Sequence, residues 1–489
     1  MLTPAAAGFF FLQKAFIEGT YYIFMKKRSY RVERDYLGVK KIPSVAYYGV
    51  QTKRALDTFA VSGLRLQKNL ISAIALIKKA AALANMKDGH LEQRKAKAII
   101  RACDDVLKGK LDDQFLVDVF QAGAGTSENM NLNEVIANRA LEILRKKKGS
   151  YHIIHPHDDV NMSQSTNDVF HSAIHIAAYL QIRRELLPAL RELEIELQKK
   201  ANRWKNVVKS GRTHLRDALP ITVGQEIGAY ATTVQRDAEQ IAENSLRLRE
   251  LNLGGTAIGT GMNATLRYRR FVIQELRMFT GAPFVVAKNL IEVTQSLSAI
   301  TETSASLKTL ALDLVRIAND FRLLSSGPAT GLGELELPAV QPGSSIMPGK
   351  VNPAVAEMLD MVGFQVVGND TTIGLCAQAG QLELNVMMPL AAFNLLESIQ
   401  ILSRGIEIFT KRCVQGIRVN EKKCWEYVEK NPILVTALTP HIGYAKAAKL
   451  AKKAYKEGRT VRELVLEGKF PNKKTLLRAL DAKKMTQPR

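Results

Sequence analysis

Cysteine and acidic residues are scarce in this sequence, and long apolar runs are missing. The four cysteines form no CxxC pair and lie far apart, at Cys103, Cys376, Cys413 and Cys424. Neither a disulfide framework nor a thiolate zinc site is therefore indicated, and a reducing cytoplasm fits best. Because no apolar run approaches the roughly 20 residues needed to span a bilayer, we expect a soluble protein with no membrane partner.

The deficit of acidic residues leaves a strongly basic chain of 489 residues. Lys and Arg number 69 against 47 Asp and Glu, a net charge of +22 that favours anionic partners. The stretch 421–489 alone has 17 Lys and Arg against 7 Asp and Glu. These basic residues follow helical periods without aromatic interleaving, so a specific nucleic-acid module is not predicted.

Residues 1–25 differ in composition from the rest. Gly8–Leu12 and Tyr21–Met25 are apolar and aromatic, and the first charge is Lys14, whereas a secretory signal has positive charge ahead of its apolar region. We expect an upstream start, with the working chain beginning near Met25 and 1–29 forming an extension.

Apolar residues recur at spacings of three and four over most of the chain, which predicts a mainly α protein. The expected long helices are 172–200, 225–251, 294–324, 354–377 and 389–413. Shorter ones are expected at 66–86, 91–107, 132–147 and from 440 onward. Some are apolar on most faces, which favours a helix bundle that subunits could share.

The segment 325–353 interrupts this pattern, because ten of its 29 residues are Gly or Pro. It ends with the run GSSIMPGKVNP, in which Asn352 and Pro353 are typical of a helix start. Backbone N–H groups at Gly343, Ser344 and Ser345, with the charge of Lys350, would suit an anion there. A capped helix with a surface lysine is the simpler alternative.

Three further segments place neutral polar side chains before helices. In 123–134, Thr126 and Ser127 are expected caps; in 155–168, Ser165, Thr166 and Asn167 precede a helix near Val169. In 211–217, Thr213 and His214 are adjacent, and Glu357 is a candidate to orient the histidine. Together the segments suggest a pocket for a small dianion and acid–base chemistry without a cofactor.

A metal site is the alternative for the third segment. His155, His157 and Asp159 have the HxHxD spacing of some metal hydrolases, but Val160 stands where such hydrolases usually carry a second His. Surface or structural histidines are favoured, and no metal is predicted.

GSSIMPGKVNP resembles the signature of the aspartase/fumarase superfamily, and the other segments match it in order and approximate spacing from about Tyr30 onward. AYYGV at 46–50, QSTND at 164–168 and GQLELNVM at 380–387 are most similar to aspartate ammonia-lyases. Class II fumarase is the alternative, because His155-Pro156 and the LVTAL run at 434–438 are fumarase-like.

The resemblance implies a three-domain subunit with a central long-helix bundle, divided at 30–165, 166–415 and 416–489. It also implies a homotetramer in which three subunits build each active site for a dicarboxylate substrate. Ser344 would be the general base, and Glu357 would support His214. Thr126, Ser165, Thr166 and Ser345 would stabilise the reacting carboxylate; Lys350, Asn352 and Thr213 would hold the other; Asn167 and His214 would face the amino group.

Two positions depart from the family pattern. Ala329 stands where relatives often have Arg, and we expect this difference to affect loop closure or specificity. His157 stands where Asn is usual, and this difference affects the accessory anion site known in fumarases. A non-catalytic, polyanion-binding protein on the same fold is the remaining alternative.

Overall fold

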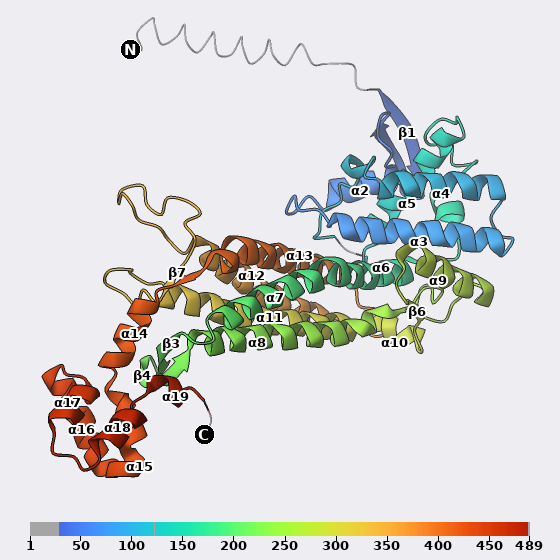
Figure 1. Ribbon diagram of the computed structural model, residues 1–489. Helices are drawn as coiled ribbons and strands as arrows, with labels where there is room; N and C mark the ends of the chain where they lie inside the picture. Colours follow the sequence, from blue (N-terminus) through green and yellow to red (C-terminus); the bar gives the residue numbers. More distant parts are fainter. Residues whose placement is uncertain (1–28, 122, 488–489) are drawn as a thin grey trace, which may run out of the picture. The chain divides into compact units, whose positions relative to one another are not determined.

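The computed structural model describes residues 29–121 and 123–487, and in these residues long helices accompany four short two-stranded sheets (Figure 1). The predicted mainly α class is confirmed. Apart from Ser29, the expected extension at 1–29 lies outside the described residues. The chain divides into two compact units, each described by itself below.

The first unit comprises residues up to 177 together with 250–296 and 379–393. Strands β1 (Tyr30–Asp35) and β2 (Gly38–Pro43) pair antiparallel, and β5 (Glu250–Leu251) and β6 (Val285–Val286) pair parallel. Its helices are α2 (Val50–Thr58), α3 (Lys68–Lys87), α4 (Gln93–Leu107), α5 (Thr126–Ile143), the start of α6 (Thr166–Gln181), α9 (Leu266–Thr280) and α10 (Leu290–Gln295).

Helix α3 forms the centre of this unit and packs against α4, α5 and α9. Leu70, Ile74 and Ile77 are fully buried, and they lie three and four residues apart on one face. By length and composition α3 could cross a bilayer, which the sequence did not predict. However, 61% of its apolar window is buried inside the protein, as in a core helix.

The second unit contains the long-helix bundle. Helices α7 (Leu187–Arg203), α8 (Val223–Asn244), α11 (Ser298–Leu324), α12 (Ala354–Gln378) and α13 (Met388–Arg412) make it up, the last from Asn394 onward. Helix α7 packs on α8, α8 on α11 and α11 on α12, and Figure 1 shows these helices side by side. The long helices predicted from the sequence are present, but that at 172–200 is broken by a π-helical turn, η3 (Ile182–Leu186).

Close approach of backbones holds the bundle together. A methyl group added to Gly363 of α12 would lie 2.3 Å from a side-chain carbon of Val315 in α11, so only glycine allows this spacing. The rings of Phe321 and Phe409 stack with centroids 5.8 Å apart, which ties α11 to α13.

The end of the chain forms a group of short helices within the second unit. They are α14 (Glu421–Lys430), α15 (Thr439–Ile442), α16 (Tyr444–Glu457), α17 (Val461–Glu467), α18 (Lys473–Ala479) and α19 (Ala482–Met485). Buried side chains such as Leu438, Leu450 and Val465 give them a hydrophobic core. The unit also contains the hairpin of β3 (Val208–Thr213) with β4 (Arg216–Thr222), and the antiparallel pair of β7 (Leu335–Glu336) with β8 (Arg418–Val419), two strands far apart in the sequence.

Candidate active site

The predicted site residues fall into two groups. The first unit holds Thr126, Ser165, Thr166 and Asn167. The second unit holds Thr213, His214, Ser344, Ser345, Lys350, Asn352 and Glu357.

The start of α6 fixes the three neighbouring polar residues of the first group. Asp168 accepts a hydrogen bond from the backbone N–H of Ser165 at 2.8 Å, and Ser165 Oγ accepts one from the N–H of Asn167 at 3.3 Å. The bond from Ser165 to Asp168 is one half of a capping box, whereas the Ser165 hydroxyl accepts from Asn167 instead of Asp168. The other oxygen of Asp168 accepts from the N–H groups of Gly254 and Thr256, at 3.0 and 3.1 Å. The turn carrying Ser165, Thr166 and Asn167 is therefore anchored to the segment 254–256.

The hydroxyl of Thr166 is oriented by a neighbouring amide. Asn129 Nδ2 donates to Thr166 Oγ1 at 3.1 Å, so the threonine oxygen acts as acceptor and its hydrogen is left for another partner. Ser165 is similar, because its Oγ accepts from Asn167. Both hydroxyls can therefore donate to an anion.

Thr126 differs from the prediction. The N-cap of α5 is Gly125, in the left-handed conformation at φ 90°, and neither Thr126 nor Ser127 caps the helix. Thr126 is the first helical residue, and its hydroxyl donates to the carbonyl of Gly123 at 2.6 Å. Glycine is required at 125 because an added methyl group would lie 2.5 Å from the ring of Phe170.

The amide of Asn167 has one defined orientation. Its Nδ2 donates to the carbonyl oxygen of Ala257 at 2.7 Å. A carbonyl can only accept, so the contacting atom must be the nitrogen. No donor among residues 29–121 and 123–487 contacts Oδ1 of Asn167, which therefore can accept from a ligand.

A buried lysine behind this group was missed by the sequence analysis. Lys78 Nζ donates to Asn161 Oδ1 at 2.7 Å and to Gln164 Oε1 at 3.1 Å. Asn129 and Asn133 donate to the same Asn161 oxygen, at 3.2 and 3.1 Å. Burial lowers the pKa of Lys78 to about 7, against the opposing charge of Asp168. Its place four residues after Ile74 puts it on the buried face of α3, a signal that the sequence already contained.

Thr213 and His214 lie at the exposed tip of the β3–β4 hairpin. His214 and Leu215 form its two-residue turn with φ of 53° and 58°, both left-handed. Such turns usually carry Asn or Gly, because a Cβ is disfavoured in this conformation. Non-glycine residues held this way are frequent at functional sites.

The signature loop, defined here as residues 343–352, is closed by hydrogen bonds between its two ends. The N–H of Gly343 donates to the carbonyl of Lys350 at 2.8 Å, and Asn352 Nδ2 donates to the carbonyl of Gly343 at 2.7 Å. Within the closed loop, Ser344 Oγ accepts from the backbone N–H groups of Ile346 and Met347, at 3.2 and 2.9 Å. Ser344 Oγ thus accepts two backbone hydrogen bonds from its own loop.

Two residues of the second unit's group, Asn352 and Glu357, differ from the predictions. Helix α12 begins at Ala354, and the Asn352 side chain holds Gly343 through its amide nitrogen instead of providing the predicted cap. Glu357 pairs with Arg322 at 3.7 Å, and no hydrogen bond joins it to His214 among the described residues.

Residues 38–368 match the family described as Lyase, and residues 434–487 match the one described as Fumarase C C-terminus. The chain belongs to the aspartase/fumarase superfamily of lyases. An aspartate ammonia-lyase of Bacillus subtilis is 48% identical over 462 residues, covering 94% of this chain and 97% of the relative. A class II fumarate hydratase of the same organism is 47% identical over 438 residues, covering 90% and 95%.

Solved structures of the superfamily share the fold. A fumarate lyase:delta crystallin protein from Brucella melitensis, bound to cobalt, has a TM-score of 0.90 at 47% identity and covers 94% of this chain and all of its own. A class II fumarase from Schistosoma mansoni has a TM-score of 0.91 at 37% identity, covering 94% and 99%. These relatives establish a lyase, but they do not separate a carbon–nitrogen from a carbon–oxygen lyase.

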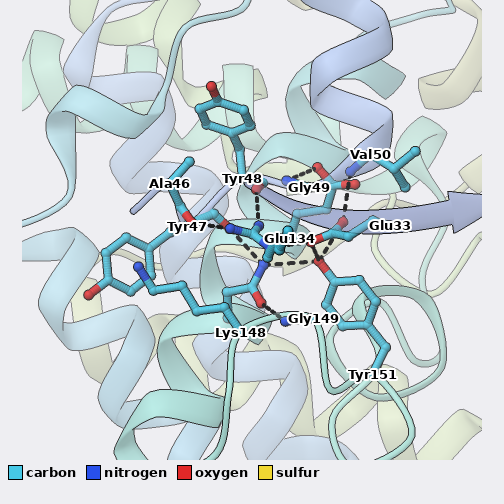
Figure 2. Close-up of polar contacts among 12 residues, drawn as sticks. Glu33, Ala46, Tyr47, Tyr48, Gly49, Val50, Glu134, Lys148, Gly149 and Tyr151 are labelled. Atoms are coloured by element: carbon cyan, nitrogen blue, oxygen red, sulfur yellow. Dashed lines mark hydrogen bonds and ion pairs between the residues drawn. The ribbon is translucent and has the colours of Figure 1, made fainter. Parts of the chain in front are cut away.

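The superfamily segment AYYGV is held by buried carboxylates (Figure 2). Glu134 accepts from the N–H groups of Gly49 and Gln51 at 2.7 and 2.8 Å, and from the hydroxyl of Thr52 at 2.6 Å. Glu33 accepts from the N–H of Val50 at 2.9 Å. Burial still raises the pKa of Glu134 to about 7, because desolvation outweighs these donors.

The side chains of the HxHxD segment, considered above for a metal, bind other groups of the protein. His155 Nδ1 accepts from the N–H groups of His157 and Asp158, and Asp159 bonds Lys95 at 2.9 Å. His157 Nε2 lies 2.7 Å from Gln51 Nε2, and burial lowers the pKa of His157. Throughout 29–121 and 123–487, no three His, Cys, Asp or Glu side chains are placed to hold a metal ion.

The other departure, Ala329, is exposed in a turn at 326–333. Ser326 closes this turn, because its carbonyl accepts from Gly333 N–H at 3.0 Å and its Oγ from Leu332 N–H at 3.0 Å. Tyr427 adds a hydrogen bond to the carbonyl of Leu332 at 3.1 Å. Tyr427 therefore anchors the start of the segment 325–353 to α14. The effect of Ala329 on closure of this segment stays a prediction.

Proposed function

We propose that this lyase is an aspartate ammonia-lyase, which reversibly converts L-aspartate to fumarate and ammonia. The observation that carries the choice of aspartate is the Oδ1 of Asn167, which accepts from no described residue. Two backbone N–H groups, of Ile346 and Met347, donate to Ser344 Oγ and support Ser344 as the base. A free serine hydroxyl is far too weak a base at neutral pH. Donors that stabilise its alkoxide lower its pKa, so Ser344 can serve as the base.

In the proposed reaction, Ser344 removes a proton from the carbon next to the one that bears the amino group. The electron pair moves into the adjacent carboxylate, which becomes an aci-carboxylate with a second negative charge. The hydroxyls of Ser165 and Thr166 can donate to it, with Thr126 and Ser345 as further donors. Collapse of this intermediate forms the double bond and breaks the bond to the ammonium group, which leaves as neutral ammonia without accepting a further proton.

The remaining site residues would bind and orient the substrate. Lys350, Asn352 and Thr213 would hold the carboxylate that does not react, and His214 and Asn167 would face the amino group. Glu357 of another subunit would orient His214. The free Oδ1 of Asn167 favours an ammonium group, because ammonium offers three donors whereas a hydroxyl offers one. This argument supports aspartate over malate.

Because the site residues come from distant segments, we propose the homotetramer typical of the family. Helix α12 supports this proposal through an exposed stripe, defined here as Met361, Phe364, Gly368, Thr371 and Leu375, whose members lie three and four residues apart. Met361, Phe364 and Leu375 are each more than 60% exposed. An apolar stripe with this spacing on a long helix is typical of a helix–helix interface.

The test is to supply L-aspartate or L-malate separately and follow the ultraviolet absorbance of fumarate. We expect fumarate from aspartate, and Ser344→Ala should reduce kcat by a factor on the order of 10³ or more while the assembly persists. Ser150→Ala, a half-exposed serine outside both groups, is the matched control. Fumarate from malate alone would make the protein a class II fumarase, and full activity of Ser344→Ala would exclude the serine base.

A further inference from the structure

A hollow of about 370 Å³ lies among four of the C-terminal helices, α14, α17, α18 and α19. None of the proposed active-site residues lines it. Its lining consists of four cationic side chains, one acidic one and three apolar ones: Arg462, Lys474, Arg478, Lys484, Asp481, Trp425, Leu477 and Ala482. Its volume is within the range of small-ligand sites, which begins at roughly 300 Å³.

The positive charge of this hollow is largely uncompensated. Asp481 accepts from the N–H of Lys483 at 3.1 Å and so caps α19, and it lies 4.0 Å from Lys484. Arg462, Lys474 and Arg478 form no ion pair with any carboxylate in 29–121 and 123–487. Three cations facing one space repel one another, and an anion with several charges would relieve that repulsion.

The hollow also has an aromatic wall. Trp425 of α14 is 45% exposed, whereas the other tryptophan, Trp204, is 5% exposed. Leu477 and Ala482 add apolar surface next to it. An indole face stacks favourably on a planar base, and arginine guanidinium groups match phosphate oxygens in two-pronged hydrogen bonds.

We propose that this hollow binds a nucleoside polyphosphate, with the base against Trp425 and the phosphates among Arg462, Lys474 and Arg478. A single nucleotide fits this concave space better than a polynucleotide, because the cations converge on one hollow instead of following a groove. The carbonyl of Thr486, just after α19, accepts from Gln225 of α8 at 2.8 Å, which holds this end of the chain against the bundle.

Fluorescence can test the proposal on the full-length protein, because Trp425 is the only exposed tryptophan of the two. Titration with ATP should quench the fluorescence saturably, and calorimetry should give the same Kd. The double variant Lys474→Gln/Arg478→Gln should raise the Kd by about tenfold or more, because two charge-assisted contacts are lost. The variant Lys452→Gln/Lys456→Gln removes the same charge from α16, outside the hollow, and should bind like the unchanged protein.

Three outcomes would overturn the proposal. The first is the absence of saturable ATP binding by either method. The second is an equal loss of affinity in the two double variants, which would mean that net charge alone attracts the ligand. The third is a ligand preference that excludes a nucleotide held by its base. Equally tight binding of inorganic tripolyphosphate would mean that the base makes no contact with Trp425, and much tighter binding of single-stranded DNA would mean that the hollow serves a polynucleotide.

Discussion

The backbone N–H of Gly49 donates to Oε2 of Glu134 at 2.7 Å across 85 residues of sequence (Figure 2). The same carboxylate accepts from Thr52, so one buried side chain of α5 fixes the entry to α2. A methyl group on Gly49 would lie 2.6 Å from a Glu33 oxygen and 2.8 Å from Cδ of Glu134. The two carboxylates leave room only for glycine.

Gly49→Ala should therefore lower the free energy of unfolding by about 1–3 kcal/mol, because both carboxylates must move. Urea unfolding measures this change. Gly228→Ala is the matched control, since Gly228 is inside α8 and its added methyl group would meet only Ala201, at 3.6 Å. The control should be neutral or stabilise by about 0.5–1 kcal/mol. Equal effects of the two substitutions would contradict the steric explanation.

Lys78→Met should lower kcat/KM on the order of 10- to 100-fold without unfolding the protein. Asn161 and Gln164 would lose their shared donor, and the turn that carries Ser165 and Thr166 would lose its support. Methionine fills a similar volume and has no charge to bury, so stability should not fall greatly.

The neighbouring lysine is the matched control for that experiment. Lys79 pairs with Asp104 at 2.7 Å near the surface, and Lys79→Met should leave kcat/KM unchanged. Steady-state kinetics and thermal unfolding of both variants check the prediction. A loss of stability in Lys78→Met that fully accounts for its loss of activity would argue against a positioning role.

Glu128 should make the fold less stable as the pH rises. Its side chain is buried, Oε1 has no hydrogen-bond partner among the described residues, and burial raises the pKa from 4.5 to about 8. Between these pH values the native state keeps a proton that the unfolded state has lost, so the free energy of unfolding falls.

Glu128→Gln removes this titration. Relative to the variant, the unchanged protein should lose roughly 1–4 kcal/mol between pH 5 and pH 8, as urea unfolding at each pH will measure. Parallel pH profiles for the two proteins would mean that Glu128 titrates normally.

Phe364→Lys should disrupt the proposed tetramer, because it places a charge within the exposed stripe of α12. Light scattering should detect smaller species, and activity should fall with them, since each site needs several subunits. Tyr455→Lys changes another exposed aromatic residue, on α16, and should leave the mass unchanged. A Phe364→Lys protein of unchanged mass would place the interface elsewhere.

The long helices were predictable because their apolar residues repeat at helical spacing over 20 or more residues. The signature loop was also predictable, from the Gly and Pro of 325–353. The interior of the first unit was not. Lys78 and Lys79 are adjacent and identical in type, yet one is buried behind the site and the other lies near the surface. The helical period after Ile74 distinguishes the two by burial, but the partners of Lys78, Asn161 and Gln164, come from a distant segment and were not predictable.

Whether a hydroxyl donates or accepts a hydrogen bond was a second property that the sequence could not predict. Thr126 and Thr166 both stand at helix starts, and the sequence predicted the same role for both. In the folded chain, the hydroxyl of Thr126 donates to its own turn, whereas that of Thr166 accepts from Asn129. The difference depends on Asn129 of α5 reaching the start of α6, a contact between segments 37 residues apart.

The burial of all four cysteines makes the protein well suited to site-directed labelling. Burial raises the pKa of Cys103, Cys413 and Cys424 to about 12, so these thiols react poorly with maleimides at neutral pH. A cysteine introduced at Ile346, which is 82% exposed, would be the preferred attachment point for a dye. Its emission would test whether the signature loop moves during turnover, without first removing any native thiol.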